Sequence, residues 1–178
     1  MQVPFDALAQ NLVNSYDDTR SPPDCLQTPQ HLKELLVQHG LHVKRVTQAD
    51  LARVRRLRDD VREVFEAGGG KQAVQLINTL LENADVRPQL DRSRGVVALD
   101  WQVAAAADVV DQVRSAAALN LALLAERFGF ERFRVCVTSP CRDVFVDVSK
   151  NATRRYCGMI CANRARVASF RERQREGR

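Results

Sequence analysis

The sequence predicts a mainly α protein that ends in a small α+β module. Apolar residues recur at intervals of three and four through residues 1–128, which is the spacing of amphipathic helices. Four of the five cysteines instead fall within residues 136–161, around a stretch that alternates like a strand. Charge divides the chain similarly: residues 132–178 contain twelve arginines and lysines against four acidic residues, a net of +8, whereas residues 1–131 have a net of −3.

Start and stop signals outline the first helices. Thr28, followed by proline, is typical of a helix start, and Gly40 is typical of the end of that helix. Thr47, with Asp50 three residues later, marks the start of a second helix. A third helix is expected over residues 71–83, after a run of three glycines.

The pattern then changes before a longer helix. Two short extended stretches within residues 88–101 are expected to pair as a hairpin across Ser93–Gly95. A helix over about residues 102–127 is expected because near-heptad apolar residues run through it: Val103, Ala106, Val110, Val113, Ala117, Leu121 and Leu124. Two interpretations of this stripe are open, a face that packs on the other helices and a seam for a homodimer.

Composition excludes several classes of protein. No apolar run approaches the ~20 residues that span a bilayer, so no membrane partner is expected. The opening residues lack a secretory signal, and we expect a cytoplasmic protein without a disulfide framework. The sequence contains neither a G-x-S-x-G motif nor a phosphate-binding glycine loop, so we expect no enzyme and no catalytic residues. Cys25 is interpreted as an incidental thiol, and His31, His39 and His42 as surface residues.

Two cysteine pairs carry the clearest chemical signal. Four residues separate Cys136 from Cys141, and three separate Cys157 from Cys161, so the second pair spans one turn of an expected helix. Four thiolates complete a tetrahedral site and leave no position for water, which is typical of a structural Zn²⁺. We therefore expect one structural Zn²⁺ per chain. The alternative is four buried free thiols.

The segment CVTSPCRDVFVDVSKNATRRYCGMICANRARVASFRERQ, residues 136–174, resembles the CGNR-type zinc finger of bacterial proteins. Ala162 stands where that family usually has glycine. Besides the cysteines, the matching positions are Phe145, Asp147, Ser149, Asn151, Arg154, Arg155, Asn163 and Arg164. The resemblance implies a treble-clef-like four-cysteine zinc module over residues 131–178, in which Phe145 and Asp147 have structural roles.

The N-terminal part is similar to the ABATE domain that usually precedes this finger. The similarity rests on NLVNS at 11–15, TPQHLKELL at 28–36, DLARVRRLRDDVREV at 50–64 and LINTLL at 76–81. It implies a mostly helical domain over residues 1–130 with a short β-hairpin, in a stress-linked transcriptional regulator. Such a domain would sense a small-molecule effector or form a homodimer.

The last helix has distinct faces at 100° per residue. Ile160, Asn163, Val167 and Phe170 share one face, which is expected to pack on the finger's hairpin. Asn163 is expected to point inward and Arg164 to pair with Asp147, both in structural roles. The opposite face, with Ala165, Ser169 and Glu172, lies between rows of arginines: Arg164, Arg171 and Arg175 on one side and Arg166 and Arg173 on the other.

Small residues between two arginine rows would suit a helix in a DNA major groove, with Ser169 near base edges and Arg166, Arg171, Arg173 and Arg175 on phosphates. The Glu172 carboxylate could accept a hydrogen bond from N4 of cytosine, or it could form an ion pair with a neighbouring arginine. Arg154 and Arg155 could contact phosphates or balance thiolate charge. We therefore expect a DNA-binding transcriptional regulator. The alternative is a zinc-stabilised protein-interaction module that does not bind nucleic acid.

Overall fold

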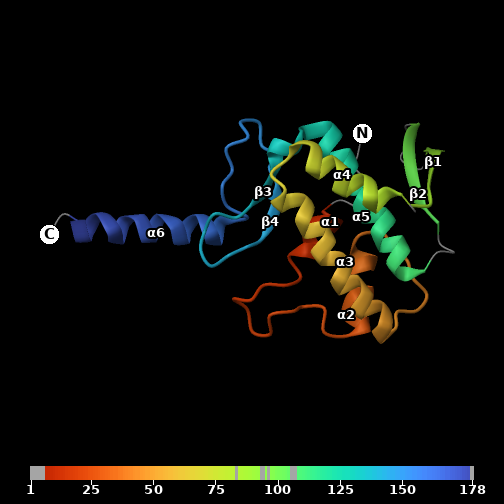
Figure 1. Cartoon of the computed structure of the whole chain (residues 1–178), viewed down its shortest axis with the longest axis horizontal. Helices are drawn as coiled ribbons and strands as arrows, with labels where there is room; N and C mark the ends of the chain where they lie inside the picture. Colours follow the sequence, from red (N-terminus) through yellow and green to blue (C-terminus); the bar gives the residue numbers. More distant parts are fainter. Residues whose placement is uncertain (1–6, 83, 93–94, 96, 105–107, 177–178) are drawn as a thin grey trace.

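The computed structural model describes residues 7–176 except 83, 93–94, 96 and 105–107. A helical body comes first in the chain, and a small finger with a projecting helix follows it (Figure 1). The helices are α1 (Leu8–Val13), α2 (Pro29–Gln38), α3 (Gln48–Glu66), α4 (Gly70–Leu81), α5 (Val109–Phe128) and α6 (Met159–Glu176). The strands form two antiparallel pairs, β1 (Val86–Asp91) with β2 (Ala98–Val103) and β3 (Phe133–Val135) with β4 (Val144–Val146).

Side-chain caps fix the helix starts that the sequence predicted. The Thr28 hydroxyl accepts a hydrogen bond from the His31 N–H at the start of α2. Thr47 and Asp50 form a complete capping box at the start of α3, in which each side chain accepts from the other's backbone N–H. Gly40 follows α2 with φ +77°, a conformation that glycine adopts without steric cost. The predicted start and end of α2 and the predicted start of α3 are thereby confirmed.

α5 is the central helix of the body. Its predicted stripe faces the core, because five of its members are at most 6% exposed: Val110, Val113, Ala117, Leu121 and Leu124. Ala116 and Ala118 are also fully buried, so small side chains let the other helices approach on more than one side. The core-facing interpretation is confirmed, and the stripe is not free to serve as a dimer seam.

The hairpin before α5 is longer than predicted, and α5 begins later. Val103 was expected on the helical stripe but pairs with Val86 at the base of the hairpin. The helix begins after Asp108, whose carboxylate accepts from the Val110 N–H at 2.7 Å. Ala106 and Ser93, which belonged to these two predictions, lie outside the described residues.

The finger's hairpin belongs to the core of the helical body. Phe133, Val144 and Val146 are buried in the same apolar cluster as the helices, and the Phe133 ring lies 5.3 Å from that of Phe65 on α3. The proposed division at residues 130/131 therefore separates sequence regions that share one hydrophobic core.

α6 extends away from the body with its C-terminus at one end of the molecule (Figure 1). The expectation that its apolar face packs on the finger's hairpin is wrong, because Ile160, Val167 and Phe170 are 71%, 49% and 56% exposed. The physical reason is that the hairpin already buries its apolar residues against α1 and α3. None of the described helices is long and apolar enough to cross a membrane.

Candidate metal centre and nucleic-acid interface

The four predicted cysteines converge on one point. Cys136 and Cys141 come from the loop between β3 and β4, Cys157 precedes α6, and Cys161 lies in its first turn. Their sulfur atoms all lie within 4.8 Å of one another. The sulfur of Cys157 is 3.7 Å from that of Cys141 and 3.6 Å from that of Cys161. A tetrahedral centre with metal–sulfur bonds of about 2.3 Å has sulfur–sulfur distances of about 3.8 Å, so the cluster fits one metal ion.

Local hydrogen bonds hold the cluster in this arrangement. The Cys157 N–H donates to the sulfur of Cys136, and the Thr138 hydroxyl donates to the carbonyl of Cys161. Burial raises the pKa of the Cys141 thiol to about 12 and also raises that of Cys157, to which hydrogen bonds with the neighbouring thiols contribute. Burial works to raise the pKa of the Cys136 thiol, but hydrogen bonds from the backbone of Cys157 and Thr138 outweigh it and lower that pKa. A metal cation that replaces the protons would stabilise the buried thiolates.

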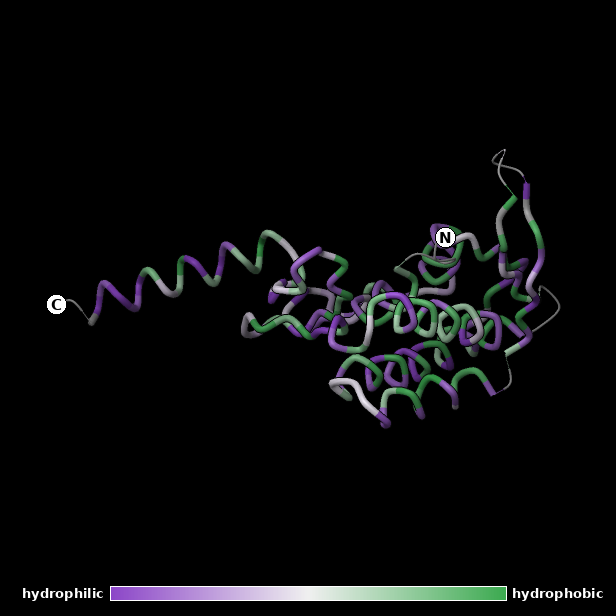
Figure 2. The backbone as a smooth tube through the Cα atoms, turned by 90° about the horizontal axis from the view of Figure 1, so that it is seen from above, coloured by the Kyte–Doolittle hydropathy of each residue, from purple (hydrophilic) through white to green (hydrophobic). Residues whose placement is uncertain are grey.

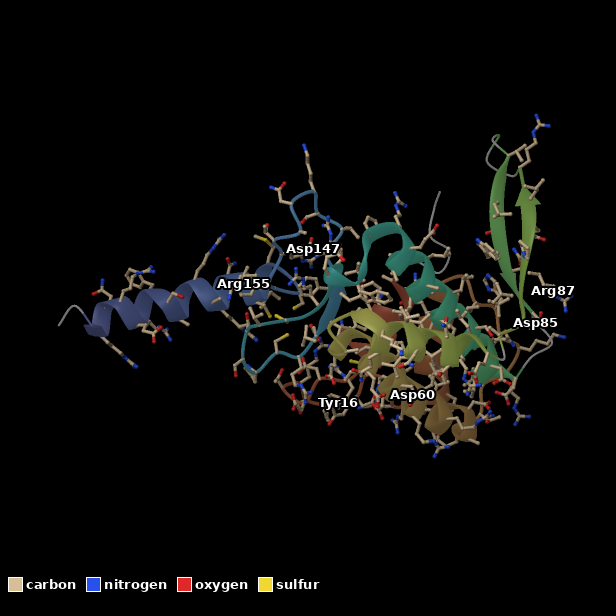
Figure 3. The ribbon with its side chains drawn as sticks, turned by 45° about the horizontal axis from the view of Figure 1, so that its top comes forward. Tyr16, Asp60, Asp85, Arg87, Asp147 and Arg155 are labelled. Atoms are coloured by element: carbon tan, nitrogen blue, oxygen red, sulfur yellow. The ribbon has the colours of Figure 1, made fainter. Side chains whose placement is uncertain are left out.

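Asp147 organises the loop between β4 and the third cysteine. It is fully buried, and one carboxylate oxygen accepts from the Ser149 N–H and hydroxyl while the other accepts from the Arg154 N–H at 2.8 Å. Burial works to raise the pKa of Asp147, but these hydrogen bonds outweigh it and hold the pKa below its ordinary value. Figure 3 labels this side chain within the finger.

Arg154 braces the same loop from outside. Its guanidinium lies 4.7 Å from the centre of the Phe145 ring and donates to the carbonyls of Tyr156 and Cys157. Phe145 is buried beneath it. These contacts fix the chain on the N-terminal side of Cys157, so the Arg154 side chain stabilises the loop that leads to the third cysteine.

Two residues expected to be structural are placed differently. Asn163 is exposed instead of pointing inward, and Arg164 does not reach Asp147, whose carboxylate is held by Ser149 and Arg154. Both differences follow from the direction of α6, which leaves the finger immediately after Cys161. Ala162 lies inside the helix, where no glycine-only conformation is needed.

The remaining predicted DNA-contacting residues are exposed. They are Arg155, which Figure 3 labels near the start of α6, and Arg166, Ser169, Arg171, Arg173 and Arg175 along that helix. Within the described residues, none of these arginine side chains forms an ion pair. Figure 2 shows polar residues alternating with shorter hydrophobic stretches along the projecting helix.

Comparison with protein families agrees with this architecture. A CGNR zinc finger matches over residues 132–174. The ABATE family, described as "Putative stress-induced transcription regulator", matches over residues 6–127, which is more than half of the chain. The chain belongs to the ABATE family. Its description is of transcription regulators, not of enzymes. Among curated proteins, no significant match to this chain was found.

In this ABATE-family chain, sequence reasoning missed the contact that joins body and finger. The Asn14 side-chain amide donates to the carbonyl of Val144 at 2.9 Å and accepts from its N–H at 2.8 Å. The Gln10 amide oxygen accepts from the Val146 N–H at 2.7 Å. Two amides, one on α1 and one at its C-terminal end, thus pair with the edge of β4 that β3 leaves open. The only available signal was the presence of two amide side chains four residues apart, which lie on one helical face.

A cleft with both polar and apolar lining residues lies beside this contact. It has a volume of ≈ 690 Å³ and is lined from the body by Asn11, Asp17 and Arg20 and from the finger by Arg154, Met159 and Arg164, among others. Arg20 is paired with Asp17 at 3.0 Å, whereas Arg164 has no ion-pair partner within the described chain. Cys25 is exposed outside the metal cluster.

Proposed function

We propose that this chain is a DNA-binding transcription regulator in which a structural Zn²⁺ fixes the finger and α6 contacts DNA. The observation that carries the proposal is the projection of α6 from the body with its arginines exposed and unpaired within the described residues. At about 1.5 Å per residue, 18 helical residues extend over about 27 Å, a length that can follow a groove beyond the body.

The two arginine rows support a particular docking geometry. They flank the small residues Ala165 and Ser169, so the rows would meet the phosphates on both sides of a major groove while Ser169 lies near base edges. Arg155 would add a phosphate contact at the start of the helix. Glu172 would accept from cytosine N4 or pair with a neighbouring arginine; no ion pair of Glu172 is seen within the described residues.

We assign the metal as zinc because four thiolates in a closed tetrahedral site suit Zn²⁺ and leave no position for catalytic water. Protein purified without added metal should contain close to one equivalent of zinc per chain, which a thiol-modifying reagent releases. Metal analysis by mass spectrometry measures both quantities. Iron in place of zinc, or a chain that folds its finger without metal, would reject the assignment.

For the N-terminal part, the cleft supports a ligand-sensing role. An effector bound there would touch both α1 and the finger, and so could alter the position of α6. A different observation supports the homodimer alternative. The β1–β2 hairpin, far from the finger, exposes the apolar side chains of Leu90, Val97 and Leu99, which a second copy of the chain could cover. In either case, the presence of a DNA-binding helix makes a cytoplasmic location the expected one.

DNA binding can be tested by fluorescence anisotropy with a labelled random duplex at about 50 mM salt, where electrostatic attraction is favoured. The Arg166→Ala/Arg173→Ala variant should bind clearly more weakly than wild type. The matched control is Arg45→Ala/Arg56→Ala, which removes the same charge from exposed positions on the body and should retain most of the affinity. All proteins must keep their zinc. If wild type does not bind DNA, the function would instead be that of a protein-interaction module.

A further inference from the structure

The exposed apolar face of α6 follows a heptad pattern. Positions 160, 163, 167, 170 and 174 alternate in steps of three and four, as the a and d positions of a coiled coil do. We call this row the α6 seam; it consists of Ile160, Asn163, Val167, Phe170 and Gln174. A groove of ≈ 510 Å³ runs beside it, lined by Ile160, Val167 and Ala168 and by Arg164 and Arg171. The seam is thus a mainly apolar helix face that no other part of the described chain covers.

Four arginines flank this seam on both sides. In the heptad that places Ile160 at a, Arg164 and Arg171 occupy the e positions, and Arg166 and Arg173 occupy the g positions. All four are exposed. In coiled coils the residues at e and g meet those of the partner helix and determine which partner is accepted.

The flanking charge argues against a second copy of the chain. Parallel pairing of two α6 helices would place g arginines opposite e arginines, and antiparallel pairing would place e against e and g against g. Both arrangements bring guanidinium groups together, which is unfavourable. A bilayer surface also fits poorly, because helices that lie on membranes have a wide apolar face, whereas Asn163 and Gln174 interrupt this narrow seam.

We propose that the α6 seam binds an acidic amphipathic helix of a protein partner. The partner helix packs apolar residues against Val167 and Phe170 and places carboxylates beside the four arginines. Asn163 favours a partner with a polar residue at the facing position, since a buried amide without a hydrogen bond is costly. The proposal goes beyond DNA binding, because the seam lies on the face opposite Ala165 and Ser169.

The probe for a direct test is a synthetic peptide of about three heptads with leucine at a and d, glutamate at e and g, and one asparagine at d. Its binding to the full-length zinc-loaded protein is measured by anisotropy of a labelled peptide. The Val167→Ser/Phe170→Ser variant should bind about tenfold more weakly or worse, because two apolar contacts are lost. The control Ala165→Ser/Ser169→Ala, on the opposite face, should change affinity by no more than about twofold. Both variants alter exposed or half-exposed positions on a projecting helix, and circular dichroism checks that the helix persists.

A charge exchange separates specific docking from general attraction. The variant in which all four flanking arginines (Arg164, Arg166, Arg171 and Arg173) are changed to Glu should no longer bind the acidic peptide and should bind a version with lysine at e and g. Equal binding of a scrambled peptide with the same composition would overturn the proposal, as would the absence of binding at about 100 μM peptide, a concentration far above the Kd of a specific contact. Two further results would also overturn it: self-association that Val167→Ser/Phe170→Ser abolishes, and tighter binding to phosphatidylglycerol vesicles than to the peptide. Failure of DNA binding would leave these outcomes unchanged.

Discussion

At the scale of single residues, side-chain amides replace a missing strand. β4 pairs with β3 along one edge, and its other edge would leave polar backbone groups of Val144 and Val146 without partners. Asn14 supplies both a donor and an acceptor there, as a neighbouring strand would, and Gln10 supplies a second acceptor. The finger is thereby attached to the body by directional contacts as well as by apolar packing.

Replacement of Asn14 by alanine should destabilise the whole protein. The N–H and carbonyl of Val144 are then left without partners at a buried position, which costs about 1–3 kcal/mol of the free energy of unfolding. Urea denaturation followed by circular dichroism measures the change. The control is Asn11→Ala, because Asn11 is exposed and its amide contacts the surface residue His39 at 3.1 Å. Equal stabilities of the two variants would contradict the role assigned to Asn14.

Asp147 should make stability depend on pH. The pKa of Asp147 is lowered in the folded protein, so its contribution is complete above the pKa of an unfolded aspartate, about 3.9. The contribution is lost as pH falls through the lowered folded value. The Asp147→Asn variant, whose amide nitrogen cannot accept, should be less stable by about 1–3 kcal/mol at pH 7. Urea unfolding of both proteins should show this difference shrinking below about pH 4; a difference that grows with acidity would be inconsistent.

At the scale of elements, the sequence predicted where helices start better than it predicted which elements they contact. Thr28, Thr47 and Asp50 act through neighbours three residues away, so their caps can be read from the sequence. Gln10 and Asn14 act across more than 120 residues, and no local pattern reveals such a contact. The metal cluster was predictable because ligand type and spacing are both restricted by the metal. The α6 seam was recognised as a face, but periodicity alone does not say whether the same chain or another molecule covers it.

Loss of the metal should loosen the finger's loops but not its hairpin. The cysteine loops depend on the cluster, whereas Val144 and Val146 of β4 are also held by α1 and the apolar core. Hydrogen exchange of the Cys157→Ser variant should therefore show lost protection over residues 136–143 and 148–162, with α3 and α5 unchanged. The Cys25→Ser variant, which alters an exposed thiol outside the cluster, is the control. Uniform loss of protection throughout the chain would show that the hairpin and the helices depend on the metal as much as the loops do.

At the scale of the whole molecule, one core spans both family regions, and α6 projects outside it. The apolar side chains of α1, α3 and α5 meet those of β3 and β4 in a single cluster. Hydrogen bonds from Gln10 and Asn14 to β4 add to this packing and hold the finger's hairpin against α1. The body can therefore act as a fixed base from which α6 projects.

A fragment of residues 1–130 should be much less stable than the full chain. It lacks Phe133, Val144 and Val146, whose burial contributes about 4 kcal/mol or more, and it leaves the Gln10 and Asn14 amides unpaired. Thermal melting measures the loss. A chain of residues 1–165 is the matched control, because it keeps all four cysteines and the core and lacks only the projecting part of α6. Equal melting temperatures for 1–130 and the full chain would show that the body is independent.

The most direct test of DNA binding by α6 is the salt dependence of affinity. Each arginine–phosphate contact should contribute about −0.9 to the slope of log K against log salt. For the Arg166→Ala/Arg173→Ala variant we predict a slope flatter by about two units, with affinity reduced equally for different sequences. The slope should be unchanged in Arg45→Ala/Arg56→Ala. If the α6 variant has the slope of wild type, or if the body variant flattens it equally, α6 is not the DNA-binding element.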